Sequence, residues 1–179
     1  MCLKRIAVIS VVGLLAIVVI GAAISSGRNR TAIQPVLHRM VALENPLVLS
    51  PQVLPLGKLP SPRMKRQLWR AESKALARTF DSGSSLIARD RHIYRVTMAA
   101  IQEESIRTTY ERIYVHVQSV VAVGPWARAT WRAQVAFSGG NHHVKPVVNG
   151  EAGVAYLHRV HGQWRVTTYS EHYIPGEGP

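Results

Sequence analysis

Residues 127–137, ARATWRAQVAF, alternate apolar and polar side chains along most of their length. Every odd-numbered position is apolar, whereas positions 128 to 134 place Arg128, Thr130, Arg132 and Gln134 between them. A period of two residues is typical of a strand with one face on a core and the other in water. The stretch therefore predicts an antiparallel sheet, with Trp131 on its buried face.

The same period recurs in the segments on either side. Residues 110–123 place five side chains on one face: Ile113, Val115, Val117, Ser119 and Val121. Residues 152–160 and 164–170 alternate in the same way, and turn sequences separate the segments: Gly124-Pro125, the loop 138–150 and His161-Gly162-Gln163. Short connections join antiparallel neighbours, so we expect four strands in a meander.

Two helices are predicted before this sheet. Residues 63–80 carry Leu68, Trp69, Ala75, Leu76 and Phe80 at helical spacing, and the polar run 81–85 ends the pattern. A second helix is expected from about Arg89 to Ile106. The sequence thus predicts an α+β domain over residues 63–174, with two helices packed on a curved four-stranded antiparallel sheet.

The closing hairpin, AYLHRVHGQWRVT at residues 155–167, resembles the NTF2-like cone fold, in which a polar Gly turn often precedes a last strand of the form G-x-W-[RK]-[IV]. The region is similar to NTF2-like segments that precede amidase-type domains in Gram-positive bacteria, and to the outer domains of bitopic type IV secretion components. The resemblance implies an extracytoplasmic scaffold or binding module. We expect no amidase-type catalytic domain in this chain.

An apolar stretch of 19 residues, from Ile6 to Ile24, precedes the domain. As a helix it would reach roughly 28 Å, close to the ~30 Å thickness of the bilayer core. We expect residues 1–26 to be a transmembrane anchor with the N-terminus cytoplasmic and the domain outside. A cleaved signal, with a site near Ser25, remains the alternative.

Residues 27–62 are expected to be a linker, because residues 27–63 contain six prolines and a long helix is not expected there. The segment is also rich in Val and Leu. We expect these side chains to pack on the domain or on the membrane surface, with a docking strip for another protein as the alternative. Residues 175–179 are expected to be a short tail.

The chain has a formal net charge of +12, which attracts polyanions such as anionic lipid or wall polymer without selecting one. Arg128, Arg132 and Arg165 are predicted to form a basic surface. Nucleic acid is disfavoured as a partner, because base stacking needs an exposed aromatic ring beside the arginines, whereas Trp131 is predicted to face the core. The single cysteine, Cys2, precedes the apolar stretch and leaves the domain without a disulfide.

Catalytic and metal chemistry find little support. The histidines and tyrosines of the sheet have no Asp after Asp90 to pair with, and Glu103, Glu104 and Glu111 are interpreted as solvated charges. Adjacent histidines in a loop cannot readily face one ion, so no metal site is expected from four residues: His142, His143, His158 and His161. We expect no cofactor and no catalytic residue.

Two hypotheses on function remain. The first is a single-pass envelope protein, an accessory or scaffold whose domain binds a protein partner or an anionic surface. The alternative is a small-ligand-binding or weakly catalytic cone, with four side chains as pocket walls: Tyr114, His116, Tyr156 and His158. Substituting His116 and His158 separates the two hypotheses.

Overall fold

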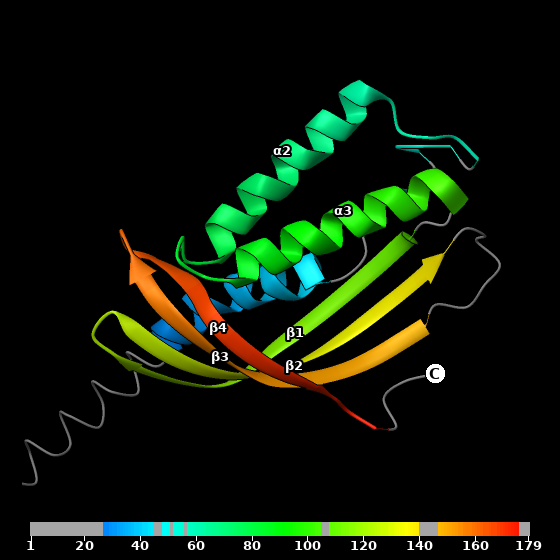
Figure 1. The fold of residues 1–179 in the computed structure, drawn as a ribbon. Helices are drawn as coiled ribbons and strands as arrows, with labels where there is room; N and C mark the ends of the chain where they lie inside the picture. Colours follow the sequence, from blue (N-terminus) through cyan, green and yellow to red (C-terminus); the bar gives the residue numbers. More distant parts are fainter. Residues whose placement is uncertain are drawn as a thin grey trace, which may run out of the picture.

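The computed structural model describes residues 27–44, 48–50, 52–55, 57–104, 108–139 and 147–175. Three helices lie on one face of a curved four-stranded antiparallel sheet (Figure 1). The N-terminal helix spans residues 27–44 and is followed by α2 (Pro62–Thr79) and α3 (Leu86–Glu104). The predicted α+β class is therefore confirmed, with three helices instead of two. The predicted anchor, residues 1–26, lies outside the described residues.

The strands are β1 (Thr108–Val123), β2 (Trp126–Gly139), β3 (Val147–Val160) and β4 (Gln163–Tyr173), and they pair in the order β1-β2-β3-β4. Every pair is antiparallel, which confirms the meander. The β3–β4 turn consists of His161 and Gly162, with φ of 49° and 79°. Two positive φ values define the mirror-image turn whose twist matches a hairpin.

The core lies between the sheet and the helices. The odd-numbered residues of β2 face it as predicted, and Trp131 is fully buried at its centre. From the helical side, α2 contributes Leu76, and Phe80 follows at its C-terminal end. A second, smaller cluster joins α2 and α3 and contains the fully or nearly buried Leu49, Leu54, Tyr94, Met98 and Ile101.

The prediction that residues 27–62 lack a long helix is wrong. Five large apolar side chains recur at helical spacing and are at most 4% exposed: Ile33, Val36, Leu37, Met40 and Val41. Pro35 lies on the exposed side of this helix, where an interior proline costs about 3 kcal/mol. Burying a large aliphatic side chain contributes ~1.5–3 kcal/mol. Five such side chains outweigh one proline, so the helix forms and joins the core.

One face assignment on β1 also needs correction. The pairing of β1 with β2 shifts by one residue between Val117 and Ser119, which marks a β-bulge. A bulge exchanges the two faces of the strand beyond it. Val115 and Val117 are therefore buried as predicted, whereas Val121 is 61% exposed and Val120 packs against the core instead.

Each edge of the sheet is partly covered by a side chain or by neighbouring backbone. Along β1, the side-chain nitrogen of Gln34 donates to the carbonyl of Val115. The side-chain oxygen of Gln34 accepts from the backbone amide of Val117 at 3.2 Å. Along β4, Phe80 forms a parallel bridge with Val166. An exposed edge strand invites pairing with another chain, and these contacts occupy part of each edge.

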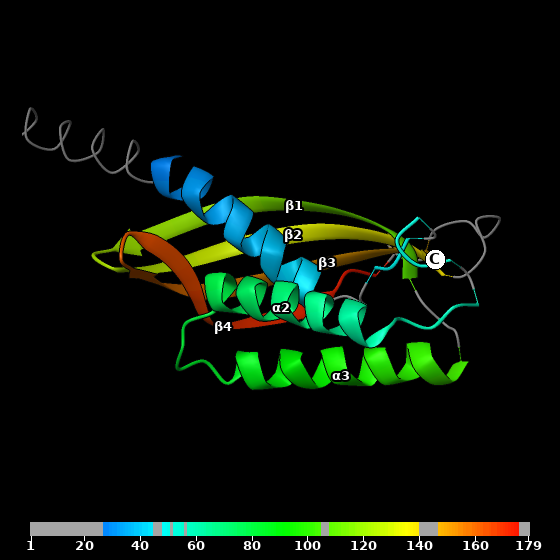
Figure 2. The same ribbon diagram turned by 90° about the horizontal axis from the view of Figure 1, so that it is seen from above.

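Figure 2 shows the N-terminal helix crossing over the sheet, with α2 and α3 side by side toward the β4 edge. Among the described residues, no helix combines the length and the apolar character needed to cross a membrane. The apolar stretch from Ile6 to Ile24 falls outside those residues.

Candidate functional site

The four predicted pocket residues lie on the face of the sheet that points away from the helices, here called the outer face. Tyr114 is 52% exposed and Tyr156 is 47% exposed, and both alternate with buried neighbours. Tyr114 and His116 line a surface hollow of about 380 Å³ together with Arg132 and Gln134. Tyr156 instead pairs with Arg128. Arg128 and Arg132 are four positions apart along β2, or roughly 13 Å, so the four predicted pocket residues form two separate pairs.

His158 has an acidic partner that was not expected. Its ring Nδ1 donates a hydrogen bond of 2.9 Å to Asp81, which lies in the turn after α2. The Asp81 amide donates to the Val166 carbonyl at 2.9 Å, and this bond holds the turn against β4. The hydrogen bond from His158 lowers the pKa of Asp81. Asp81 lies before all four strands and 77 positions from His158, so the sequence of the sheet does not reveal this pair.

The imidazole of His158 also stacks on the indole of Trp126, with 4.2 Å between ring centroids and 14° between planes. In the described part of the chain, Asp81 is the only hydrogen-bond partner of this imidazole. An imidazole oriented by a carboxylate can act as a general base. Its position beside an exposed aromatic ring equally suits a contact surface.

An apolar patch surrounds Arg128 on the outer face. Val123 is 75% exposed and Trp126 is 53% exposed. The register places these side chains together, because Val121 pairs with Arg128, which pairs with Tyr156. We call Val121, Val123, Trp126, Arg128 and Tyr156 the outer patch.

The predicted basic surface is only partly continuous with this patch. Arg128 and Arg132 are both exposed on β2. Arg165 pairs with His158 across β3 and β4 and is half-buried. Its Nε atom is buried without a hydrogen-bond partner. Two of the three arginines are thus exposed on the outer face.

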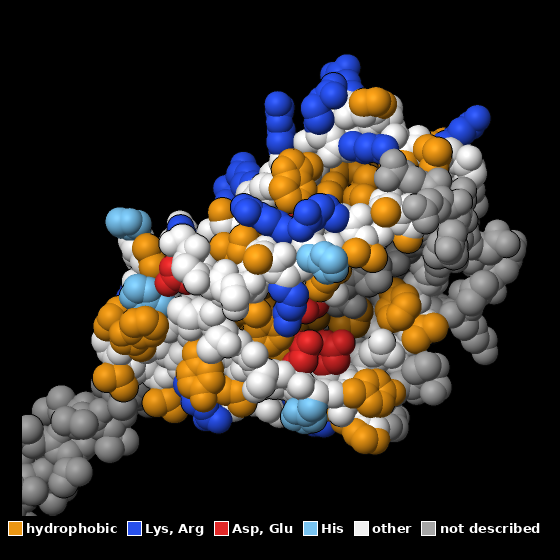
Figure 3. Space-filling view, viewed as in Figure 1, with side chains coloured by type: hydrophobic (Ala, Val, Ile, Leu, Met, Phe, Trp, Pro, Cys, Tyr) orange, Lys and Arg blue, Asp and Glu red, His pale blue; other side chains and the backbone are white. Residues whose placement is uncertain are grey.

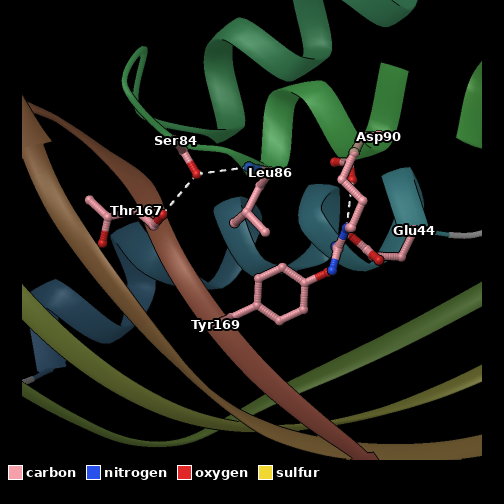
Figure 4. Close-up of polar contacts among 7 residues, drawn as sticks. Glu44, Ser84, Leu86, Asp90, Thr167 and Tyr169 are labelled. Carbon is pink, nitrogen blue, oxygen red and sulfur yellow. Dashed lines mark hydrogen bonds and ion pairs between the residues drawn. The ribbon is translucent and has the colours of Figure 1, made fainter. Parts of the chain in front are cut away.

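A second polar site, which the sequence did not indicate, lies between the helices and the inner face of the sheet (Figure 4). The guanidinium of Arg89 on α3 donates through Nη2 to the Glu44 carboxylate and to the Tyr169 hydroxyl, and through Nε to Asp90 at 3.4 Å. Glu44 ends the N-terminal helix and Tyr169 belongs to β4. One cation therefore joins three elements.

Carboxylates gather around this cation, and burial shifts their titration. Asp90 is 1% exposed, and burial together with the nearby Glu44 raises its pKa to about 7. Burial, with Glu44 and Glu151 nearby, likewise raises the pKa of Glu171 to about 7. We call Glu44, Arg89, Asp90, Glu151, Tyr169 and Glu171 the inner cluster. Figure 3 shows Asp and Glu side chains gathered at one place on a face where Lys and Arg are otherwise more common.

The contacts within the inner cluster also raise the pKa values of Arg89 and Tyr169. Burial alone would lower the pKa of Arg89, but the Tyr169 hydroxyl and the Glu44 carboxylate raise it above its usual value. Burial and Glu44 raise the pKa of Tyr169. At neutral pH the cluster therefore holds a permanent cation, a neutral phenol and two carboxyls, Asp90 and Glu171, that are close to their titration points.

Glu111 was interpreted as a solvated charge, and the structure corrects this. It pairs with Phe137, which packs against the core, and one of its carboxylate oxygens is buried without a hydrogen-bond partner. Burial raises its pKa to about 7. The parity of β1 places Glu111 on the same inward face as Val115, and this parity is the signal that could have located it.

Within the described residues, no three His, Cys, Asp or Glu side chains are placed to hold a metal ion. His142 and His143 lie outside those residues. The sequence matches no protein-family model and no curated protein.

Proposed function

We propose that the chain is a single-pass membrane protein whose extracytoplasmic NTF2-like domain is an accessory module that docks a protein partner on its outer patch. The apolar stretch from Ile6 to Ile24 supports the anchor by its length and composition. The described part of the N-terminal helix runs from residue 27 to residue 44 and contributes to the core from Ile33 onward. A domain connected in this way would sit directly on the membrane surface.

The outer patch is the observation that carries the docking proposal. Its aromatic and aliphatic side chains are 47% to 75% exposed and lie at adjacent register positions around Arg128. Exposed Trp and Tyr beside Arg are the residue types that contribute most to protein interfaces. The partner that fits is a protein with an acidic surface bearing apolar side chains, because Arg128 and the net charge of +12 favour a negative counterpart.

Photo-crosslinking of the full chain in its native membrane tests this proposal. A photoreactive residue at position 123 should give one discrete adduct, which Trp126→Ala should reduce at least tenfold, since a central interface Trp is worth ~2 kcal/mol or more. Trp69→Ala is the matched control, because Trp69 is also exposed but lies on α2. Equal adduct yields in the two variants would contradict docking on the outer patch.

The inner cluster favours a second candidate function, the binding of a small organic cation by its carboxylates. Glu44, Asp90, Glu151 and Glu171 come from four elements, and the Glu44 carboxylate helps to raise the pKa of the other three. Partly buried acidic groups with shifted pKa values concentrate at functional sites. In a thermal-shift titration with spermidine, Glu171→Gln should weaken binding about tenfold if the inner cluster binds cations, because one charge-assisted hydrogen bond is lost. His116→Ala, on the outer face, is the control, and an unchanged response in both variants would exclude cation binding by the inner cluster.

A further inference from the structure

A third site lies between the N-terminal helix, the end of α2 and the β3–β4 turn. It is a pocket of about 400 Å³, and its lining includes Pro35, Arg39, Arg78, Gln163 and Trp164. Arg39 comes from the N-terminal helix and Arg78 from the last turn of α2. Neither the outer patch nor the inner cluster shares a residue with it.

The two guanidinium groups in this pocket lack an anionic partner. Within the described residues, neither Arg39 nor Arg78 forms an ion pair with a carboxylate. The Nε atom of Arg39 is buried without a hydrogen-bond partner. Burial, and then the charge of Arg78, lowers the pKa of Arg39. No acidic residue contributes to that shift, so the positive charge is not neutralised within the described chain.

A third guanidinium lies at the same end of the sheet. Arg159 is positioned over the Trp164 ring, 5.9 Å from its centroid, and its Nε donates to the Gly162 carbonyl at 3.3 Å. Gly162 and Trp164 both line the pocket. Holding like charges close together costs free energy unless an anion lies between them.

We propose that this pocket binds a phosphate group, held by the guanidinium groups of Arg39 and Arg78. The planar fork of a guanidinium matches two phosphate oxygens at once. The oxygens of a phosphate are arranged tetrahedrally and can accept from guanidinium groups on two sides, whereas the two oxygens of a carboxylate lie in one plane. The free Nε of Arg39 supplies a donor that no described residue satisfies.

Two sources can supply this group, a phospholipid headgroup or a soluble phosphate. The headgroup source rests on the proposed membrane anchor, since the N-terminal helix that lines the pocket follows the apolar stretch in the sequence. The soluble source does not depend on it. If the chain has no membrane anchor, only the phospholipid headgroup is removed as a source.

The test uses the full chain in neutral detergent, titrated with inorganic phosphate against sodium chloride of equal ionic strength while the unfolding temperature is measured. Phosphate should stabilise the wild type, and Arg78→Gln should weaken this effect about tenfold or more, as expected for one charged hydrogen-bond donor. Arg39→Gln should do the same. Arg70→Gln is the control, because it removes the same charge from an exposed position on α2.

Arg78 is exposed, so Arg78→Gln should fold even if Arg39→Gln does not. In nanodiscs, a higher unfolding temperature with phosphatidylglycerol than with phosphatidylcholine, lost in Arg78→Gln, would identify the headgroup as the source. A response to phosphate alone would identify the soluble source. Equal responses of Arg78→Gln and Arg70→Gln to both probes would overturn the phosphate site.

Discussion

Arg89 donates through Nε to the buried carboxylate of Asp90 at 3.4 Å, while its Nη2 atom is bonded to Glu44 and Tyr169. The second carboxylate oxygen of Asp90 has no hydrogen-bond partner. The guanidinium of Arg89 is thus shared among three groups. It offsets only part of the free-energy cost of burying a charge on Asp90. This explains why the pKa of Asp90 rises to about 7 although a guanidinium is adjacent.

The raised pKa predicts a definite pH dependence of stability. Asp90 titrates near pH 7 in the fold and near pH ~4 in the unfolded chain, so the folded state binds more protons between these values. Its contribution to stability is fully present below about pH 4 and is lost as the pH rises to about 7.

Asp90→Asn should remove this decline and exceed the wild type in unfolding free energy at pH 8 by roughly 1–3 kcal/mol, because the amide has no charge that burial would destabilise. Urea unfolding between pH 4 and pH 8 measures the effect. If the unfolding free energies of the two proteins change with pH in parallel, Asp90 is ionised in the fold throughout this range, and the prediction is contradicted.

Gly153 is predicted to be required for the packing of Trp131. It pairs with Trp131 across β2 and β3, and a Cβ at this position would meet the Ser170 carbonyl and come within 2.9 Å of the indole. Gly153→Ala should therefore destabilise the fold by about 2–3 kcal/mol, the usual cost of overpacking a core. Thermal unfolding measures this loss. Gly83→Ala is the control, because open space surrounds that position, and a similar loss in both variants would contradict the explanation.

Gln34 is predicted to protect the β1 edge. Gln34→Ala removes the two hydrogen bonds to Val115 and Val117, which should cost about 1–2 kcal/mol. The freed backbone groups should also promote association through the edge at high concentration. Urea unfolding and light scattering measure the two effects. Gln67→Ala, on the exposed side of α2, should show neither, and a monodisperse Gln34→Ala protein of unchanged stability would refute the role.

The sheet could be predicted because its signal is local. Each strand encodes its own buried face with a period of two, and the turns contain Gly where a positive φ is needed, as at Gly124 and Gly162. The bulge after Val117 leaves no such signal, so the faces beyond it were misassigned. It depends on how β1 and β2 pair, which is a property of two strands.

The N-terminal helix was not predicted because two patterns in residues 27–62 conflict. The prolines argue against a helix, whereas the apolar spacing favours one. Ile33, Val36, Leu37, Met40 and Val41 show the helical period, and only Pro35 lies within residues 27–44. The inner cluster was missed for a different reason. Glu44, Arg89 and Glu171 are far apart in the sequence and meet only when three elements pack together. Only Glu151 left a local signal, because it has the parity of the buried Ala155 and Leu157, whereas a register shift in β4 after Val166 breaks the parity of Glu171.

The membrane topology is tested most directly by thiol labelling in intact cells. Cys2 is the only cysteine, and Val123 is 75% exposed on the outer patch. With Val123→Cys, a membrane-impermeant maleimide should label the thiol at position 123 in intact cells, whereas Cys2 should react only after the cells are lysed. Labelling of position 123 only after lysis would contradict an anchored domain on the outside of the membrane.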